Sequence, residues 1–448
     1  MNPVIVKTQI PGPKSRQSID AALEILPLAQ YAGLFGITLK KGQGIYLTDH
    51  DDNVFMDFLA GASAVSLGYA RQEIIETYQE AASQIQHSCF PYSPNDQAVK
   101  FAKKLIEITP GDHKKKVLFG LSGSDSVDAA IKIAQRFTGK PKVLSFRGAY
   151  HGSTGFSISA NGFVGLQTGL FLGENFVFCD FPRTEEEMTK TLINIEQLLQ
   201  TGQFAALITE TIQGDGGNVV APPNFHQELW SLVKKYEAVH IVDEVQSGVG
   251  RSGKWWEIEN FEVIPDILCT AKAITSGYIP MSACIARAEM ADTLGKAQHL
   301  FTYSGHPPSA AIGLKVIEII ERENLINNAL ERGAELKEGL QKLVVQYPFA
   351  LEVRGLGLHI GFEVYDKEKE IPLGGLFAFR CVEKGLYPGY FGSKNEVMRL
   401  HPPLIINKKE MEFAIAILTS VVEEWHNGTF PQSTLENYRQ FGVGLGTD

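Results

Sequence analysis

Residues 239–253 read VHIVDEVQSGVGRSG and join a short, continuous apolar run to an acid and then to a glycine-rich turn. A run of this length, rich in β-branched residues and bounded by turn residues, is typical of a strand that is buried on both faces. Asp243 stands at the end of the run. The stretch therefore predicts a buried strand whose carboxyl end carries a charged group.

Six further runs of the same kind lie between residues 115 and 287, and they read KKVLFGL, PKVLSF, ENFVFCD, FAALITE, PDILCT and MSACIAR. Helical patterns at residues 125–137, 185–200 and 224–236 separate several of them. This alternation predicts an α/β domain with a mostly parallel, seven-stranded sheet. Ligands of such sheets gather at the carboxyl ends of the strands, so the functional residues are expected there.

The rest of the chain predicts a second, smaller α+β domain. A helical pattern at residues 307–344 gives way to new strand signals in ALEVRGLGLHIGFEVY, which places a boundary near residue 330. Residues 1–60 contain GQGIYLTDHDDNVFMDF, which resembles a hairpin, and we expect this segment to pack with residues 331–448. Residues 61–330 then form the large domain.

The amino-acid composition limits the kinds of partner that the chain is expected to bind and the compartment in which it is expected to work. The chain is 44% hydrophobic and 21% charged, as in globular proteins, and its net charge of −10 argues against a nucleic-acid or anionic membrane surface. Its five cysteines are odd in number and widely spaced, so neither disulfides nor a zinc or other metal site is expected, and a reducing cytoplasm is predicted. The polar N-terminus and the lack of long apolar runs predict neither export nor membrane spanning.

Two predicted strand ends carry groups suited to a flat, phosphorylated ligand. Ser122, Gly123 and Ser124 follow a strand and open a helix, whose first N–H groups form an anion site. Tyr150, followed by His151 and Gly152, comes after the strand KVLSF, where its ring is placed to stack on a flat ligand. The structural alternatives are an ordinary helix N-cap and a core aromatic residue.

Two other strand ends carry charge. Asp243 is a buried carboxylate, which is costly unless it meets a cation, a metal or a strong donor; a structural salt bridge is the alternative. Lys272 lies among small residues in ILCTAKAITSGY. A desolvated lysine has a lowered pKa, and its neutral amine can form a Schiff base, whereas the alternative is a lysine that extends to the surface. Together the four strand ends supply what pyridoxal 5'-phosphate (PLP) requires.

These motifs resemble those of the class III, or ω-, aminotransferases, which are PLP-dependent enzymes of fold type I. The resemblance runs from FMDFLAGASAVSLGY to VMRLHPPLII, and DEVQSGVGRSG followed by Lys272 is its most specific part. It implies that Lys272 forms the internal aldimine, that Asp243 keeps the ring nitrogen protonated and that Gln246 bonds the ring hydroxyl. Gly123 and Ser124 match the positions that hold the phosphate.

Further site residues follow from the same resemblance. Tyr150 matches the aromatic residue that stacks on the ring, and Arg399 matches the arginine that binds the substrate α-carboxylate. Glu210 matches the acid that neutralises this arginine in some members. Thr302 matches a threonine that reaches the cofactor phosphate of the partner subunit, which implies a homodimer with sites at the interface and is compatible with a tetramer.

The resemblance implies transfer of an amino group from an amino acid or ω-amine to a 2-keto acid. Some positions depart from the usual pattern: Ser153 stands where γ-aminobutyrate enzymes place an arginine, and His306, GDGG and GSDS also differ. FLAGASAVSLG, GSDSVDAAIK, YHGST and QGDGG are instead similar to the branch of amino-acid 2-epimerases and racemases, so an isomerase of apolar amino acids is the alternative. A nucleotide-binding protein that uses the SGSDS turn is a third reading.

Overall fold

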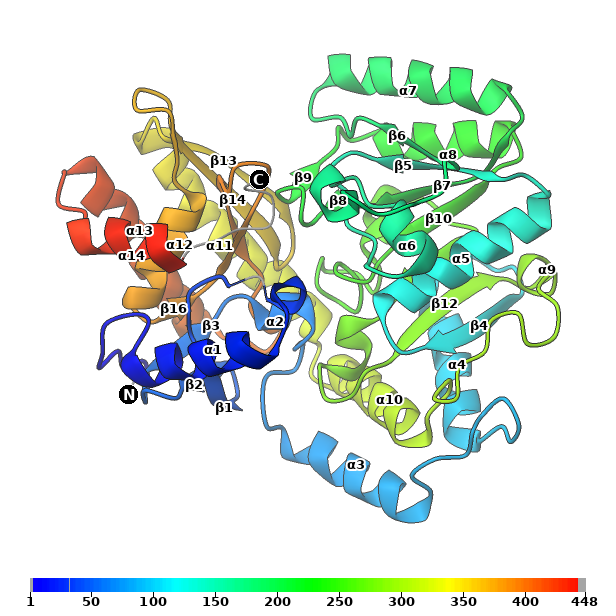
Figure 1. The fold of residues 1–448 in the computed structure, drawn as a ribbon, viewed down its shortest axis with the longest axis horizontal. Helices are drawn as coiled ribbons and strands as arrows, with labels where there is room; N and C mark the ends of the chain where they lie inside the picture. The colour runs from blue at the N-terminus through cyan, green and yellow to red at the C-terminus, as the bar shows by residue number, and fades with distance from the viewer. Residues whose placement is uncertain (1–2, 32, 442–448) are drawn as a thin grey trace. The chain divides into compact units, whose positions relative to one another are not determined.

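The computed structural model describes residues 3–31 and 33–441. These residues divide into two compact units, and each is described by itself (Figure 1). Unit 1 comprises the described residues of Met1–Arg71, Gly216–Asn218 and Asn327–Asp448. Unit 2 comprises Gln72–Asp215 and Val219–Ile326.

The centre of unit 2 is a seven-stranded sheet with the order β4-β12-β11-β10-β7-β5-β6. Its strands are β4 (Lys115–Gly120), β5 (Lys142–Phe146), β6 (Phe176–Cys179), β7 (Phe204–Glu210), β10 (Val239–Asp243), β11 (Ile267–Thr270) and β12 (Ser282–Arg287). Strand β12 runs antiparallel to both of its neighbours, and all other neighbouring pairs are parallel. The mostly parallel sheet predicted from the sequence is confirmed.

Helices cover both faces of this sheet, which explains why its strands are apolar without alternation (Figure 1). Val143 on β5 packs with α5, whereas the next residue, Leu144, points to the opposite face and packs with α7 and α8. The helices of unit 2 are α3 (Gln72–Gln84), α4 (Asp96–Ile108), α5 (Gly123–Thr138), α6 (Gly155–Ser159), α7 (Glu185–Gln200), α8 (Phe225–Lys235), α9 (Ala288–Ala291) and α10 (Pro307–Arg322). Short elements complete the unit: the pair β8 (Ile212–Gln213) and β9 (Val219–Val220), and the 3-10 turns η2 (Val164–Gln167), η3 (Glu257–Phe261) and η4 (Lys272–Thr275).

Helix α5 begins directly after strand β4 because of a capping box. The Ser122 hydroxyl accepts a hydrogen bond from the N–H of Asp125 at 3.3 Å, and the Asp125 carboxylate accepts one from the N–H of Ser122 at 3.1 Å. These two bonds satisfy donors that a helix start leaves open. The cap therefore fixes the amino end of α5 at the carboxyl end of β4.

Unit 1 contains two further sheets. One has the order β1-β2-β3-β16, and the other has the order β13-β14-β18-β17 with β15 paired to β14. The strands are β1 (Leu39–Gln43), β2 (Tyr46–Asp49), β3 (Val54–Asp57), β13 (Ala350–Leu356), β14 (His359–Asp366), β15 (Ile371–Pro372), β16 (Leu386–Tyr387), β17 (Gly389–Phe391) and β18 (Val397–Leu400). The predicted hairpin is confirmed, because β2 and β3 pair antiparallel. Strand β16 pairs with β3 in parallel, so segments far apart in the sequence share one sheet.

The helices of unit 1 are α1 (Pro13–Ile25), α2 (Ala60–Ser63), most of α11 (Leu325–Gln346), α12 (Gly374–Glu383), α13 (Lys408–His426) and α14 (Gln432–Phe441), with the 3-10 turn η1 (Leu28–Gln30) near the N-terminus. The helical pattern at residues 307–344 is interrupted between α10 and α11. Asn324 lies at this break with a φ of 52°, in the left-handed region that asparagine tolerates better than most residues. A left-handed residue ends the helical hydrogen-bond ladder.

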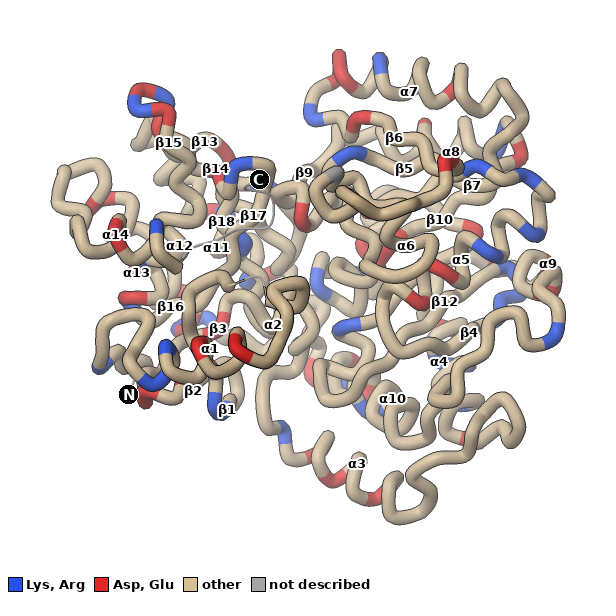
Figure 2. The backbone as a smooth tube through the Cα atoms, viewed as in Figure 1, with Lys and Arg blue, Asp and Glu red and all other residues tan. Residues whose placement is uncertain are grey.

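Charged residues of both signs are distributed along each unit (Figure 2). Helix α7, for example, carries an ion pair between Glu186 and Lys190 at 2.6 Å on its exposed face. Among the helices of residues 3–31 and 33–441, none combines the length and the apolar character needed to cross a bilayer. The exposed face of α7 thus carries charged side chains of both signs, as is typical of a solvated helix face.

Candidate active site

The carboxyl ends of the parallel strands in unit 2 lie at one edge of the sheet. Asp243, the last residue of β10, pairs in register with Glu210 on β7 and with Cys269 on β11. Lys272 lies one residue beyond the end of β11, after Ala271, and begins η4. The structure thus brings Glu210, Asp243 and Lys272, all predicted site residues, to neighbouring strand ends.

Lys272 has an unusual backbone conformation. Its φ is 40°, in the left-handed region that a residue with a long side chain seldom adopts. Such strained positions cost roughly 1–3 kcal/mol and cluster at functional sites, where the surrounding structure holds them. The conformation supports a functional role for this lysine rather than a simple surface position.

The amino end of α5 provides an anion site. The Ser122 cap occupies the N–H of Asp125, and within the described part of the chain no group accepts a hydrogen bond from the N–H of Gly123 or Ser124. The helix dipole adds positive potential at the same place. A side chain on Gly123 would press against Val245, 2.8 Å from its Cγ1 atom, so glycine keeps the approach open. These features suit a phosphate group.

The loop after β5 closes against this anion site. The Ser124 hydroxyl accepts a hydrogen bond from the N–H of Ser153 at 3.1 Å, and the Ser153 hydroxyl lies 3.0 Å from the Tyr150 hydroxyl. Gly152 lies between them with a φ of 128°, and a Cβ atom there would overlap the Ser124 hydroxyl. The predicted aromatic residue and the predicted phosphate-binding residues therefore lie together.

Asp243 is held by a histidine to which the sequence reasoning assigned no role. The Nδ1 atom of His151 lies 2.7 Å from Oδ2 of Asp243, and both side chains are buried. The other carboxylate oxygen accepts a hydrogen bond from the N–H of Val245 at 3.0 Å. Asn161 fixes the histidine in turn, because its side chain accepts from the N–H of His151 at 2.6 Å and donates to the carbonyl of Gly152 at 2.7 Å. The only indication in the sequence that His151 belongs to the site was its position directly after Tyr150, the predicted stacking residue.

Glu210 is a buried acid at the end of β7. Its carboxyl oxygens accept hydrogen bonds from the N–H groups of Tyr150 at 3.2 Å and Gly214 at 3.1 Å. Burial raises the pKa of Glu210 well above its usual range, the negative charges of Asp243 and Asp215 raise it further, and the two N–H groups only partly oppose this. The side chain is therefore held toward its neutral form.

Gln246 offers an unsatisfied polar atom. Its Nε2 atom donates to Asp215 at 3.5 Å, while its Oε1 atom is buried and has no hydrogen-bond partner among the residues that the structure describes. A Cβ atom on Gly214 would overlap this oxygen, so the chain passes very close to it. A buried acceptor without a donor is costly, and a hydroxyl group of a bound ligand would satisfy it.

Two predicted residues do not belong to these strand ends. Thr302 is exposed in the turn that precedes α10. Arg399 belongs to unit 1, where it lies on β18 with 1% of its surface exposed and its guanidinium group 3.5 Å from the centre of the Phe391 ring. The structure therefore gathers the predicted cofactor-binding residues of unit 2 other than Thr302 at the strand ends, whereas Arg399 belongs to unit 1.

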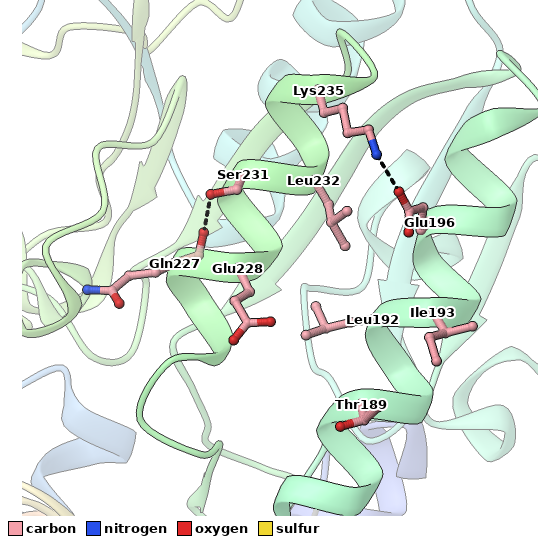
Figure 3. Close-up of a pocket in the computed structure, with 9 residues that line it drawn as sticks. All are labelled: Thr189, Leu192, Ile193, Glu196, Gln227, Glu228, Ser231, Leu232 and Lys235. Carbon is pink, nitrogen blue, oxygen red and sulfur yellow. Dashed lines mark hydrogen bonds and ion pairs between the residues drawn. The ribbon is translucent and has the colours of Figure 1, made fainter.

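A surface groove between α7 and α8 is not part of this site (Figure 3). The groove has a volume of about 510 Å³ and is lined by apolar side chains such as Leu192, Ile193 and Leu232. An ion pair between Lys235 and Glu196, 2.6 Å long, joins the two helices beside the groove (Figure 3). None of its lining residues belongs to the strand ends described above.

The strand-end residues fit PLP. The amino end of α5 suits the phosphate of PLP, and the unsatisfied Gln246 oxygen suits its ring hydroxyl. Asp243 is an acid that can pair with the protonated ring nitrogen, and Lys272 carries an amine that can react with the aldehyde. The site therefore contains a suitable group for each functional part of the cofactor.

Comparison with known proteins identifies the family. Residues 29–422 match the family described as aminotransferase class-III. The chain is 36% identical to an alanine/serine racemase from Pyrococcus horikoshii, covering 95% of this chain and 93% of that protein. It is 29% identical to an isoleucine 2-epimerase from Lentilactobacillus buchneri, covering 94% and 98%. The solved structure of a transaminase from the marine bacterium Virgibacillus superposes with a TM-score of 0.84 at 27% identity, covering 92% of this chain and 99% of that one. The chain therefore belongs to the class III aminotransferases, which are PLP-dependent enzymes.

Proposed function

We propose that Lys272 and Asp243 carry the chemistry of this PLP-dependent aminotransferase, which moves an amino group from an amino acid or ω-amine to a 2-keto acid. The observation that carries the proposal is that both residues lie at neighbouring strand ends, with His151 holding the Asp243 carboxylate at 2.7 Å. When bound, PLP supplies an electron sink for the bond cleaved next to the substrate nitrogen.

Each of the residues at this site would have a defined task in the reaction. Lys272 would hold the cofactor covalently until the substrate amine displaces it, and the freed Lys272 amine would then move the proton from the substrate carbon next to the nitrogen. Asp243 holds a proton at the ring nitrogen, and His151 keeps the carboxylate oriented. The remaining groups position the cofactor: the N–H groups of Gly123 and Ser124, the side chain of Gln246 and the ring of Tyr150.

Substrate recognition falls to three residues in this proposal. Arg399 binds the α-carboxylate, for which a planar guanidinium is well shaped. Glu210 would neutralise Arg399 when the donor lacks this carboxylate, and pairing with the guanidinium would ionise Glu210 despite its burial. Ser153 leaves no cation at the position where a distal carboxylate is bound in other members, so a substrate with one carboxylate is favoured.

We infer that the working enzyme is a homodimer in the cytoplasm. Exposed Thr302 would then reach the cofactor phosphate of the partner subunit, and a tetramer built from such dimers is compatible with the same contact. Free thiols on the cysteines of the described residues agree with a reducing compartment.

The domain division belongs to the same proposal. The large, cofactor-binding domain is residues 61–330, and the small domain combines residues 1–60 with residues 331–448. The parallel pairing of β16 with β3 supports the association of the two terminal segments.

Isomerisation of an amino acid is a second candidate function. The observation that favours it is the match of the chain to an alanine/serine racemase and an isoleucine 2-epimerase over nearly their whole lengths. In this reaction the proton returns to the substrate carbon from the opposite face, so no keto acid is consumed. Lys272 would keep its task of removing the proton and Asp243 its task at the ring nitrogen, and a second acid on the opposite face would return the proton.

A two-part assay separates the candidates. The PLP-loaded enzyme is incubated with L-alanine or L-isoleucine, with and without the monocarboxylic keto acid 2-oxobutyrate, and the products are resolved by chiral chromatography. Aminotransfer predicts one stoichiometric turnover without the keto acid and sustained turnover with it. Sustained formation of the inverted amino acid without the keto acid supports isomerisation instead.

A control variant tests the assigned lysine. Lys272→Ala is expected to lose both reactions, and borohydride reduction of the PLP-loaded wild-type protein followed by peptide mapping is expected to label Lys272. A label on any other residue would refute the assignment.

A further inference from the structure

The loop between β5 and α6 meets the proposed cofactor-binding residues at two places. Its His151 lies against Asp243, and the N–H of its Ser153 donates to the Ser124 hydroxyl at 3.1 Å. The first contact involves the acid proposed to serve the ring nitrogen, and the second involves the proposed phosphate site. The conformation of this one loop would therefore set the geometry at two ends of the bound cofactor.

One buried side chain bridges this loop. Asn161 lies two residues beyond α6 and is 1% exposed. Its Oδ1 atom accepts a hydrogen bond from the N–H of His151 at 2.6 Å, and its Nδ2 atom donates to the carbonyl of Gly152 at 2.7 Å. Because one partner is a backbone donor and the other a backbone acceptor, they determine which way the amide group points. Asn161 thus holds the main chain of two consecutive loop residues.

The imidazole of His151 depends on this main chain for its position. Its Nδ1 atom lies 2.7 Å from Oδ2 of Asp243, while its buried Nε2 atom has no hydrogen-bond partner among the residues that the structure describes. Apart from packing, the ring is oriented by Asp243 and by the backbone to which it is attached. A misplacement of about 1 Å in a supporting group can cost roughly a hundredfold in rate, so the support of this backbone matters.

The bond from Asn161 to Gly152 acts on the other end of the loop. Gly152 has a φ of 128°, a conformation that residues with a side chain rarely adopt. The hydrogen bond to its carbonyl stabilises this conformation, and the following N–H, that of Ser153, then points to the Ser124 hydroxyl. Loss of the bond would loosen the contact beside the proposed phosphate site.

Asn161 is itself held in place by its surroundings. The Nε2 atom of Gln167 on η2 donates to the carbonyl of Asn161 at 2.8 Å and to that of Ile158 on α6 at 2.9 Å. The N–H of the next residue, Gly162, donates to the carbonyl of Ala149 at 2.8 Å. A side chain that positions others needs such a fixed base.

We propose that Asn161 is a positioning residue for the cofactor. At the ring-nitrogen end it holds His151 against Asp243, and at the phosphate end it keeps the Ser153 N–H on Ser124. The inference rests on the proposed function, because it concerns the same site. Asn161 acts through the main chain of the loop, and no contact with cofactor or substrate is assigned to it.

The first measurement is the PLP affinity of the apoprotein, determined by equilibrium dialysis. Asn161→Ala removes both hydrogen bonds and is expected to lower the affinity about tenfold, the change that corresponds to one or two ordinary hydrogen bonds. Asn328→Ala is the matched control, because its amide also holds main chain, at the carbonyls of Leu404 and Ile406 within unit 1. This control should keep the wild-type affinity. Unchanged affinity in Asn161→Ala would overturn the inference.

A double-mutant cycle separates positioning from packing. Its readout is the rate at which the PLP-saturated enzyme releases deuterium from the α-carbon of labelled L-alanine in the presence of pyruvate, a step that aminotransfer and isomerisation share. Asn161→Ala is expected to slow this release about tenfold in the wild-type background and less than about twofold in a His151→Ala background, where the positioned imidazole is gone. The loss of PLP affinity should persist in both backgrounds, because the phosphate end does not use the imidazole. Equal slowing of deuterium release in both backgrounds would contradict the proposal.

A milder variant keeps the test decisive if Asn161→Ala folds poorly. Gln167 is only partly buried, and Gln167→Ala removes the support of the Asn161 carbonyl. It is expected to slow deuterium release about threefold, and this loss should again disappear in the His151→Ala background. If the wild type binds no PLP or releases no deuterium, the proposed function fails. If it does both but neither variant depends on His151, only this inference fails.

Discussion

Gly152 shows how the absence of one methyl group shapes the site. Its φ of 128° is costly for any other residue, and a Cβ atom would overlap the hydroxyl of Ser124. Gly152→Ala is expected to destabilise the protein by about 1–3 kcal/mol and to weaken PLP binding, since Ser124 must move away from the phosphate position. Urea denaturation and PLP dialysis measure the two effects.

Gly139 provides the matched control for this substitution. It also has a positive φ, 68°, at the carboxyl end of α5, but a Cβ atom there meets nothing within 4 Å. Gly139→Ala is expected to cost about 1 kcal/mol through backbone strain alone and to leave PLP affinity unchanged. Equal affinity losses in both variants would show that the overlap with Ser124 is irrelevant.

A site residue could be recognised from the sequence where its immediate neighbours along the chain mark it. Asp243 and Lys272 could be recognised because each ends or follows an apolar run, and their roles came from the family resemblance. The contact between His151 and Asp243 joins residues 92 positions apart, and no local pattern shows which donor will meet a buried carboxylate. The neutral state of Glu210 likewise depends on burial that only the folded chain provides.

Among the secondary-structure elements, the strands were more predictable than the helix ends. Continuous apolar runs such as that of β10 are readable because helices cover both faces of the sheet. The interruption between α10 and α11 was missed because apolar spacing continues across it, and only the left-handed backbone of Asn324 ends the helix. A helical pattern shows which residues face a core but not where the hydrogen-bond ladder stops.

The layer between α8 and β10 makes a prediction about acid stability. His226 on α8 and His240 on β10 are buried, and burial lowers their pKa values to about 3 and about 4. Both ring nitrogens of His240 lack hydrogen-bond partners in the part of the chain that the structure describes. The folded protein therefore keeps both rings neutral in a pH range where the unfolded chain protonates them.

The direction of the effect follows from proton uptake. Below a pH of about 6.5 the unfolded chain binds protons that the folded state does not, so the free energy of unfolding falls as the pH decreases toward 4. Each histidine is expected to contribute a loss of about 2 kcal/mol between pH 7 and pH 5. His240→Leu should remove one such contribution in urea denaturation, whereas the exposed control His50→Gln should not. An unchanged pH dependence in His240→Leu would contradict this account.

At the scale of the whole molecule, the two units are built from segments far apart in the chain. Gly216–Asn218 belongs to unit 1 although the residues on either side belong to unit 2. Arg354 on β13 holds this segment by donating to the carbonyl of Gly217 at 2.6 Å and to that of Asn218 at 3.1 Å. A segment of three residues is too short to change the local amino-acid composition. The sequence therefore predicted only the boundaries near residues 60 and 330.

The proposed homodimer makes a prediction that only a shared site satisfies. If Thr302 serves the cofactor of the partner subunit, a dimer of one Lys272→Ala chain and one Thr302→Val chain contains one intact site, with Lys272 from one chain and Thr302 from the other. Each variant alone is expected to be nearly inactive at limiting PLP, whereas an equal mixture, unfolded and refolded together, should regain about a quarter of the wild-type activity, since half of the dimers are mixed.

The matched control for this mixture pairs Lys272→Ala with Asp243→Ala. Because Lys272 and Asp243 lie at neighbouring strand ends of the same chain, every site in that mixture lacks one of them, and no activity should return. Recovery is measured as aminotransfer to 2-oxobutyrate at limiting PLP. If the Lys272→Ala and Thr302→Val mixture shows only the average of its two components, Thr302 does not act across an interface, and the site is complete within one chain.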